Sequence, residues 1–119
     1  MRYLLMIYTD EKTEASMSPA EQGAYMQAYN DFTKATNDRK AFQAGEALQS
    51  TATATTVRVR SGKTVTTDGP YAETKEQLGG YYLLNCKNLD EAIEFAAMIP
   101  GAKHGSIEVR PIMEFGEQA

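Results

Sequence analysis

The side chains best suited to chemistry gather in one polar stretch, residues 66–80, with the sequence TTDGPYAETKEQLGG. This stretch separates two apolar segments and combines carboxylates, a phenol and an amine: Asp68, Tyr71, Glu73 and Lys75. Such groups hold polar ligands or move protons. Long ordered connections in compact domains are often functional, so we expect a binding cleft to be lined by this stretch. A solvated surface turn is the alternative interpretation.

The order Asp68-Gly69-Pro70 predicts a stiff corner within this stretch. Proline fixes its own φ, and a short carboxylate can accept backbone N–H bonds from residues that follow it. We therefore expect Asp68 to be a structural acceptor first and a ligand contact second. Residues 72–77 favour one or two helical turns, which Gly79 would end in a left-handed conformation.

Other candidate residues lie on the segments beside this stretch. Arg58 alternates with two valines in VRVR, and Glu46 lies in a mostly apolar segment, where a carboxylate needs a partner. Either residue can also be purely structural, on a solvated hairpin face or in an ion pair. The walls of a cleft would come from tyrosines: Tyr71, Tyr81 and Tyr82.

Metal and cofactor chemistry have little support in the sequence. The chain has one histidine, His104, and one cysteine, Cys86. A single histidine cannot build a zinc site, and no His or Cys pair has ligand spacing, so we expect no metal and no cofactor. His104 precedes a glycine and is interpreted as an exposed loop residue. Cys86 ends the apolar run YYLLNC and is interpreted as a buried thiol.

The elements that must position these residues can be read from hydrophobic spacing and helix caps. Ser18-Pro19 with Glu21 predicts the start of one helix, and Asn88 with Glu91 predicts another. Residues 9–17 are polar and predict a loop. The predicted order is strand, helix, strand, hairpin, strand, helix and strand, at residues 2–8, 18–37, 41–48, 57–67, 81–86, 88–99 and 106–115. This order indicates an α+β fold with a ferredoxin-like split βαβ layout.

Two of the predicted strands, RYLLMIY and YYLLNC, are apolar on both faces. Both helices of a split βαβ layout cover the same face of the sheet, so the other face needs a cover. A second copy of the chain is the simplest cover, because two-fold dimers are the commonest assembly. We therefore expect a homodimer whose two sheets pack together as a dimeric α/β barrel.

Length and charge set the remaining limits. The chain has 119 residues, which fit a single domain, 1–119. Its net charge of −4 disfavours a nucleic-acid partner. No segment approaches the ~20 apolar residues of a membrane span, and the N-terminal apolar run is too short for a signal peptide. These features predict a cytoplasmic protein.

The motif DGPYAETKEQLGGYYLL resembles the defining motif of the YCII-related family in its DGPF branch, with Tyr71 where the branch name implies Phe. The segments GEAL, TVRVRSGKTVTTDGP, NLDEAIEFA and GSIEVRPI resemble that branch too, so the resemblance covers nearly the whole chain. It implies a ferredoxin-like dimer and no established activity. Proteins of this kind are often found beside extracytoplasmic-function sigma factors in bacteria. The His and Asp pair of the other branch has no counterpart here, because SPAEQGAYM lacks histidine and Ile99 replaces the Asp.

Two functions remain open from the sequence. The first is a dimer that binds a small molecule in a cleft lined by residues 66–80, with catalysis left undecided. The second is a non-catalytic module that binds another protein, such as a sigma factor, for which an acidic chain suits a basic partner. A deep cavity with convergent polar groups would favour the first, and an exposed apolar patch outside the dimer interface would favour the second.

Overall fold

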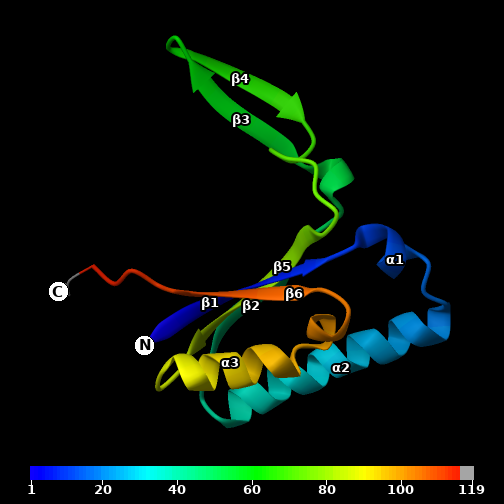
Figure 1. Ribbon diagram of the computed structural model, residues 1–119, viewed down its shortest axis with the longest axis vertical. Helices are drawn as coiled ribbons and strands as arrows, with labels where there is room; N and C mark the ends of the chain where they lie inside the picture. The colour runs from blue at the N-terminus through cyan, green and yellow to red at the C-terminus, as the bar shows by residue number, and fades with distance from the viewer. Residues whose placement is uncertain (116–119) are drawn as a thin grey trace.

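The computed structural model describes residues 1–115 and shows a four-stranded sheet, helices on one of its faces, and a separate hairpin (Figure 1). Helical elements are α1 (Glu11–Ala15), α2 (Pro19–Asp38) and α3 (Leu89–Met98), with the 3₁₀ turns η1 (Thr51–Thr53) and η2 (Pro100–Lys103). Strands are β1 (Arg2–Thr9), β2 (Phe42–Ala47), β3 (Thr55–Arg60), β4 (Lys63–Asp68), β5 (Gln77–Asn85) and β6 (Ser106–Pro111). The predicted α+β class is confirmed.

The main sheet has the strand order β2-β5-β1-β6, and every neighbouring pair is antiparallel. Strand β5 therefore lies between β1 and β2, which are consecutive strands in the chain. Helices α2 and α3 run beneath the sheet, while the hairpin β3–β4 extends from the other side (Figure 1). This arrangement leaves one face of the sheet without a helix.

The core lies between the sheet and the two helices because strand residues alternate in direction. On β1, Leu5 and Ile7 are buried on the helix side, whereas Leu4 and Met6 are half-buried on the other side. Burial is completed by Phe32 of α2 and by side chains of β5, α3 and their flanks: Tyr82, Leu84, Cys86, Ala92, Phe95, Ala96 and Ile99. The predicted buried thiol is confirmed.

The predicted caps of both long helices are confirmed. Ser18 accepts a hydrogen bond from the Glu21 amide at 3.1 Å, and Glu21 accepts one from the Ser18 amide at 2.8 Å. The Asn88 side chain accepts a hydrogen bond from the Glu91 amide at 2.9 Å. These contacts satisfy N–H groups that the helix itself leaves unpaired.

The prediction of a loop over residues 9–17 is wrong where α1 forms. Asp10 caps this short helix by accepting a hydrogen bond from the Lys12 amide at 2.9 Å. The Glu11 carboxylate then accepts bonds from the Thr51 amide and hydroxyl at 2.9 and 2.8 Å, and the Glu11 amide donates to Gln77 at 3.0 Å. A helix of five residues is marginal alone, so these long-range contacts stabilise it.

The hairpin β3–β4 stands away from the rest of the molecule (Figure 1). Its two-residue turn, Ser61-Gly62, has φ values of 51° and 74°, as a type I′ hairpin turn requires. The radius of gyration is 16.5 Å, against about 13–14 Å for a compact domain of this length. The predicted hairpin is confirmed. The large radius of gyration reflects its extension away from the body, and we call residues 55–68 the arm.

The predicted helical turns over residues 72–77 are absent, because local side chains bond the backbone in a non-helical path. Thr74 Oγ1 donates to the Glu76 carbonyl at 2.5 Å, and Gln77 Nε2 donates to the Thr74 carbonyl at 2.6 Å. Gly79 consequently lies within β5, at a bulge opposite β1, instead of capping a helix.

Candidate functional site

A cleft of about 650 Å³ lies between the N-terminal half of α2 and strands β2 and β5. Glycines make room for it on the strands. A Cβ atom on Gly79 would have Thr9 Oγ1 as its nearest neighbour, at 3.8 Å, so this bulge residue leaves open space. Gly80 instead allows close strand packing, because a Cβ atom there would lie 2.8 Å from the Glu46 carbonyl oxygen.

The walls of the cleft are largely aromatic. Tyr25 and Tyr29 contact each other edge to face, with ring centroids 5.1 Å apart. The Tyr82 hydroxyl lies 3.0 Å from Thr33 Oγ1, which fixes that ring between α2 and the sheet. The aromatic residues that line the cleft come from α2, β2 and β5: Tyr25, Tyr29, Phe42, Tyr81 and Tyr82.

One end of the cleft holds a polar cluster from three separate segments. The Tyr25 hydroxyl donates to Glu14 Oε2 at 2.7 Å and lies 3.5 Å from the Tyr29 hydroxyl. His104 Nε2 is 3.4 Å from the Tyr25 hydroxyl and 3.8 Å from Glu14 Oε2. Glu14 comes from α1, the tyrosines from α2, and His104 from the loop after η2. The side chains of Glu14 and His104 are 29% and 33% exposed, so both remain within reach of solutes.

The two phenols of this cluster are held in their neutral form. Burial, with hydrogen bonds to Tyr29 and Glu14, raises the pKa of Tyr25 far above its ordinary value. Burial also raises the pKa of Tyr29. Because both phenols stay protonated, they act as hydrogen-bond donors near neutral pH, and Glu14 is the anionic acceptor of the cluster.

The structure separates the site residues predicted from the sequence. Glu46 and Tyr81 are register partners on β2 and β5, and both line the cleft. Arg58 and Asp68 lie on the hairpin, and the rest lie on the connection that leads back to β5: Tyr71, Glu73 and Lys75. Of residues 66–80, only Gly79 and Gly80 line this cleft. The connection meets the cleft at its last two residues.

The predicted bonds from the segment after Pro70 to Asp68 are not formed. Asp68 is exposed, and its carboxylate accepts no hydrogen bond within residues 1–115. The corner is instead held through Gly69, whose φ is 103°. The Gly69 amide donates to the Ala54 carbonyl at 2.7 Å, and its carbonyl accepts from Thr56 Oγ1 at 2.8 Å.

Sequence reasoning missed the polar cluster. His104 was interpreted as an exposed loop residue, and Glu14 lay in a predicted loop. Tyr25 and Tyr29 carried a signal, since they are four residues apart on one helix face. No pattern linked that face to Glu14 or to His104, because the three segments meet only in the folded chain.

Metal binding and membrane spanning have no structural indication in the part of the chain that the structure describes. Within residues 1–115 there is no group of three His, Cys, Asp or Glu side chains placed to hold a metal ion. Among the same residues, no helix has both the length and the apolar character needed to cross a bilayer.

Comparison with known proteins relates this chain to a domain family and to a bacterial protein. The family model of the YCII-related domain matches residues 1–116. An uncharacterized protein of Rhizobium meliloti (strain 1021) is 40% identical over 119 positions, which cover 94% of this chain and 92% of the relative.

Proposed function

Since the chain belongs to the YCII-related family, we propose that it is a homodimeric, cytoplasmic protein of the DGPF branch that binds a small molecule in the cleft beside α2. One observation carries this proposal: a cleft of about 650 Å³ whose walls are aromatic and whose end holds the bonded pair Glu14 and Tyr25. Ligand sites are typically apolar clefts of this size with a few convergent polar groups.

The cleft contains two of the site residues that were expected from the sequence. Glu46 and Tyr81 line it, so they stay in the proposed site. The other expected residues lie outside the cleft of a single chain: Arg58, Asp68, Tyr71, Glu73 and Lys75. We propose that they serve the arm and the contacts between two assembled chains.

The uncovered face of the sheet supports the dimer. Leu4 and Met6 on β1 lie beside Leu83 and Tyr81 on β5, and all four are half-buried although no helix covers them. A second sheet packed here would complete a ferredoxin-like dimeric barrel, in keeping with the strand order β2-β5-β1-β6.

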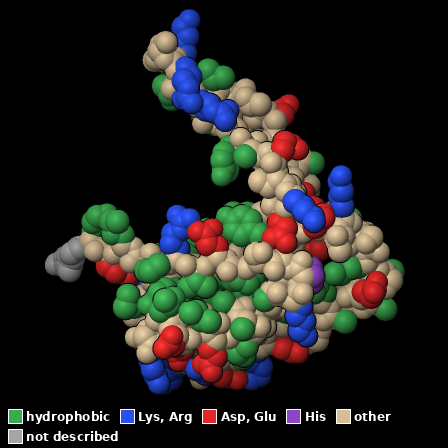
Figure 2. Space-filling view, viewed as in Figure 1, with side chains coloured by type: hydrophobic (Ala, Val, Ile, Leu, Met, Phe, Trp, Pro, Cys, Tyr) green, Lys and Arg blue, Asp and Glu red, His purple; other side chains and the backbone are tan. Residues whose placement is uncertain are grey.

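The arm supports the dimer as well. An isolated two-stranded hairpin is marginally stable in water, and Val57, Val59 and Val65 are 60%, 62% and 43% exposed on this one. Figure 2 shows open space between the arm and the body, with hydrophobic side chains exposed along the arm. A second chain seated in this space would bury them.

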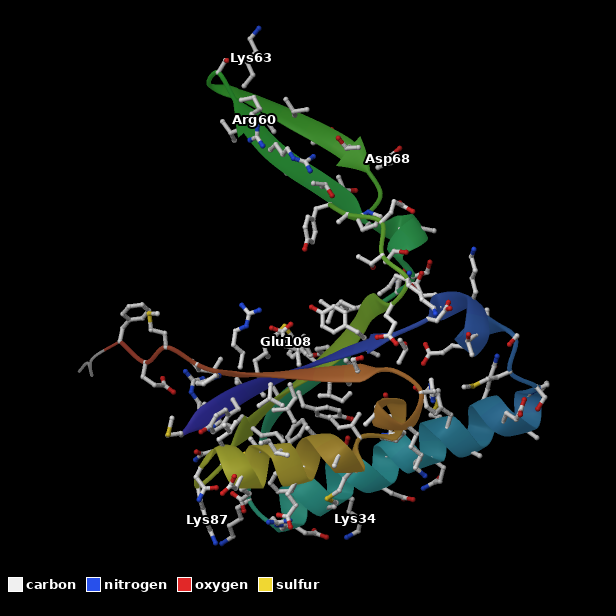
Figure 3. All side chains as sticks on the ribbon, in the orientation of Figure 1. Lys34, Arg60, Lys63, Asp68, Lys87 and Glu108 are labelled. Atoms are coloured by element: carbon white, nitrogen blue, oxygen red, sulfur yellow. The ribbon has the colours of Figure 1, made fainter. Side chains whose placement is uncertain are left out.

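Charge favours a second copy as the partner of the arm. Residues 55–68 carry Arg58, Arg60, Lys63 and Asp68, a net charge of +2, which leaves −6 on the rest of the chain. Figure 3 shows Arg60 and Lys63 toward the tip of the arm. The basic arm of one chain therefore complements the acidic body of another.

The alternative is a non-catalytic module whose arm binds a different protein, such as a sigma factor. The exposed valines of the arm are the observation in its favour. The two functions differ in the purified protein. A module that reserves its arm for another partner leaves the cleft beside α2 without a ligand.

A thermal-shift screen of a chemically mixed collection of small molecules tests the proposal. A binder stabilises the native state by RT ln(1 + [L]/Kd), so compounds that occupy the cleft raise the melting temperature. The matched variant is Gly79→Val, because Gly79 lines the cleft and a Cβ atom there meets Thr9 Oγ1 at an ordinary 3.8 Å.

We expect stabilising compounds to lose their effect on Gly79→Val while the variant stays folded. A screen without any stabilising compound contradicts the proposal, and so does an equal response of the two proteins. Gly80 would be a poor choice for this comparison, because a side chain there lies 2.8 Å from backbone and would disturb the sheet itself.

A further inference from the structure

We infer that the ligand of this cleft is an organic cation, an amine or ammonium group carried on an apolar body. This inference rests on the proposed function, since it names the chemical class that the cleft beside α2 takes. It follows from the charge of the lining residues, from the aromatic walls and from the hydrogen bonds of Glu14.

The charged residues that line the cleft are both acidic. Glu14 and Glu46 are among its lining residues, and none of those described is Lys, Arg or His. His104 Nε2 is 3.8 Å from Glu14 Oε2, but it lines a second cleft, between α2 and the segment 98–104, and not this one. An anionic ligand would therefore meet carboxylates without a compensating positive charge.

Glu14 has one oxygen atom free for a ligand. Its Oε2 accepts the Tyr25 hydroxyl at 2.7 Å, which fixes the orientation of the carboxylate. Its Oε1 accepts no hydrogen bond from residues 1–115. An ammonium group is a donor without acceptor capacity, and charge-assisted bonds to a carboxylate are among the strongest hydrogen bonds.

The aromatic walls favour the same class of ligand. Five aromatic residues line the cleft, and cations are attracted to the faces of Tyr and Phe rings by the ring quadrupole. The same rings bury the apolar body of the ligand. Glu46 and Tyr81 are opposite each other across β2 and β5 on the uncovered side, so they contribute at the rim.

The test compares ligands that differ in charge and little else. The first set is 2-phenylethylamine, 2-phenylethanol and 3-phenylpropanoate, and the second is tryptamine, tryptophol and indole-3-propanoate. Each is titrated by calorimetry into the wild type, Glu14→Gln and Glu94→Gln at pH 8 and low ionic strength. Glu94→Gln is a matched control because this substitution removes the same charge from α3, where the Glu94 side chain is 61% exposed.

We expect the amine of at least one set to bind about tenfold more tightly than the alcohol, and the carboxylate to bind most weakly. Glu14→Gln should remove this preference by weakening only the amine, and Glu94→Gln should retain it. If alcohol or carboxylate binds as tightly as the amine, or if Glu14→Gln keeps the preference, the cation inference is wrong while the cleft remains a small-molecule site. If no compound of either set binds, the cation inference is overturned, and the proposed function then depends on the thermal-shift screen of the mixed collection.

Discussion

The hydroxyl of Tyr25 and the carboxylate of Glu14 form a hydrogen bond of 2.7 Å that joins α2 to α1. Helix α1 is too short to be stable alone, so this bond and the contacts of Glu11 determine where it lies. The bond also closes one end of the cleft and orients the only carboxylate in its polar cluster.

Replacing Tyr25 with Phe should destabilise the protein by about 1–2 kcal/mol, because it leaves a half-buried carboxylate without its donor. Tyr71→Phe is the matched control. Tyr71 is 83% exposed and makes no hydrogen bond through its hydroxyl within residues 1–115, so its loss should change the free energy of unfolding very little. Urea denaturation of both variants measures the difference. Equal stabilities would show that the Tyr25 bond does not stabilise the fold.

Stability should fall at alkaline pH through the same residues. Burial raises the pKa of Tyr25 and Tyr29 above the ordinary value of 10.0 that both regain on unfolding. The folded state therefore binds more protons, and the stabilisation is complete below pH 10 and is lost as pH rises above it.

The tyrosinate absorbance at 295 nm, followed beside circular dichroism, measures this effect. Tyr25 and Tyr29 should ionise only as the protein unfolds, and Tyr25→Phe should show a shallower alkaline loss of stability. Ionisation of all seven tyrosines in one step near pH 10, with the fold intact, would contradict the account.

Gly69 should contribute more to the stability of the protein than Asp68 does, at the corner between the arm and the connection. Asp68→Ala should change stability by less than about 0.5 kcal/mol, as expected for an exposed residue without a special contact. Gly69→Ala should cost about 1 kcal/mol or more, since alanine is strained at a φ of 103°. Thermal melts compare the two variants. A larger loss for Asp68→Ala would restore the carboxylate as the structural acceptor of this corner.

The uncovered face should bring two chains together. Sedimentation equilibrium at micromolar concentration should give a dimer for the wild type and a monomer for Leu83→Lys, which places a charge in the apolar face. Ile93→Lys is the control, because Ile93 is 50% exposed on α3, on the covered side of the sheet. A monomeric wild type would remove the dimeric barrel and favour the protein-interaction alternative.

Local signals in the sequence predicted the two long helices. Features that depend on contacts between distant segments of the chain were not predicted. The caps at Ser18 and Asn88 are short-range patterns, so both long helices were predicted with their starting residues. Helix α1 was missed because Thr51 and Gln77, far along the chain, stabilise it. The helical turns expected over residues 72–77 do not form, for the opposite reason. Helix propensity is fair there, but the Thr74 and Gln77 side chains bond the local backbone in another conformation.

The candidate site was predicted only in part for the same physical reason. Tyr81 and Glu46 were found because they lie on strands whose pairing follows from the fold. Glu14 and His104 were missed because nothing in their own segments indicates that both approach Tyr25. A polar cluster built from two helices and one loop becomes visible only when the tertiary contacts are known.

The most direct test of the central claim, a small-molecule site beside α2, is a map of backbone amide shifts by nuclear magnetic resonance during a titration with tryptamine. Glycine amides are convenient reporters here, because Gly45, Gly79 and Gly80 line the cleft whereas Gly62 and Gly69 lie on the arm and its corner. We expect saturable shifts at the first three and unchanged positions for the last two. Shifts centred on Gly69 and the connection after it, with the cleft glycines unchanged, would contradict it.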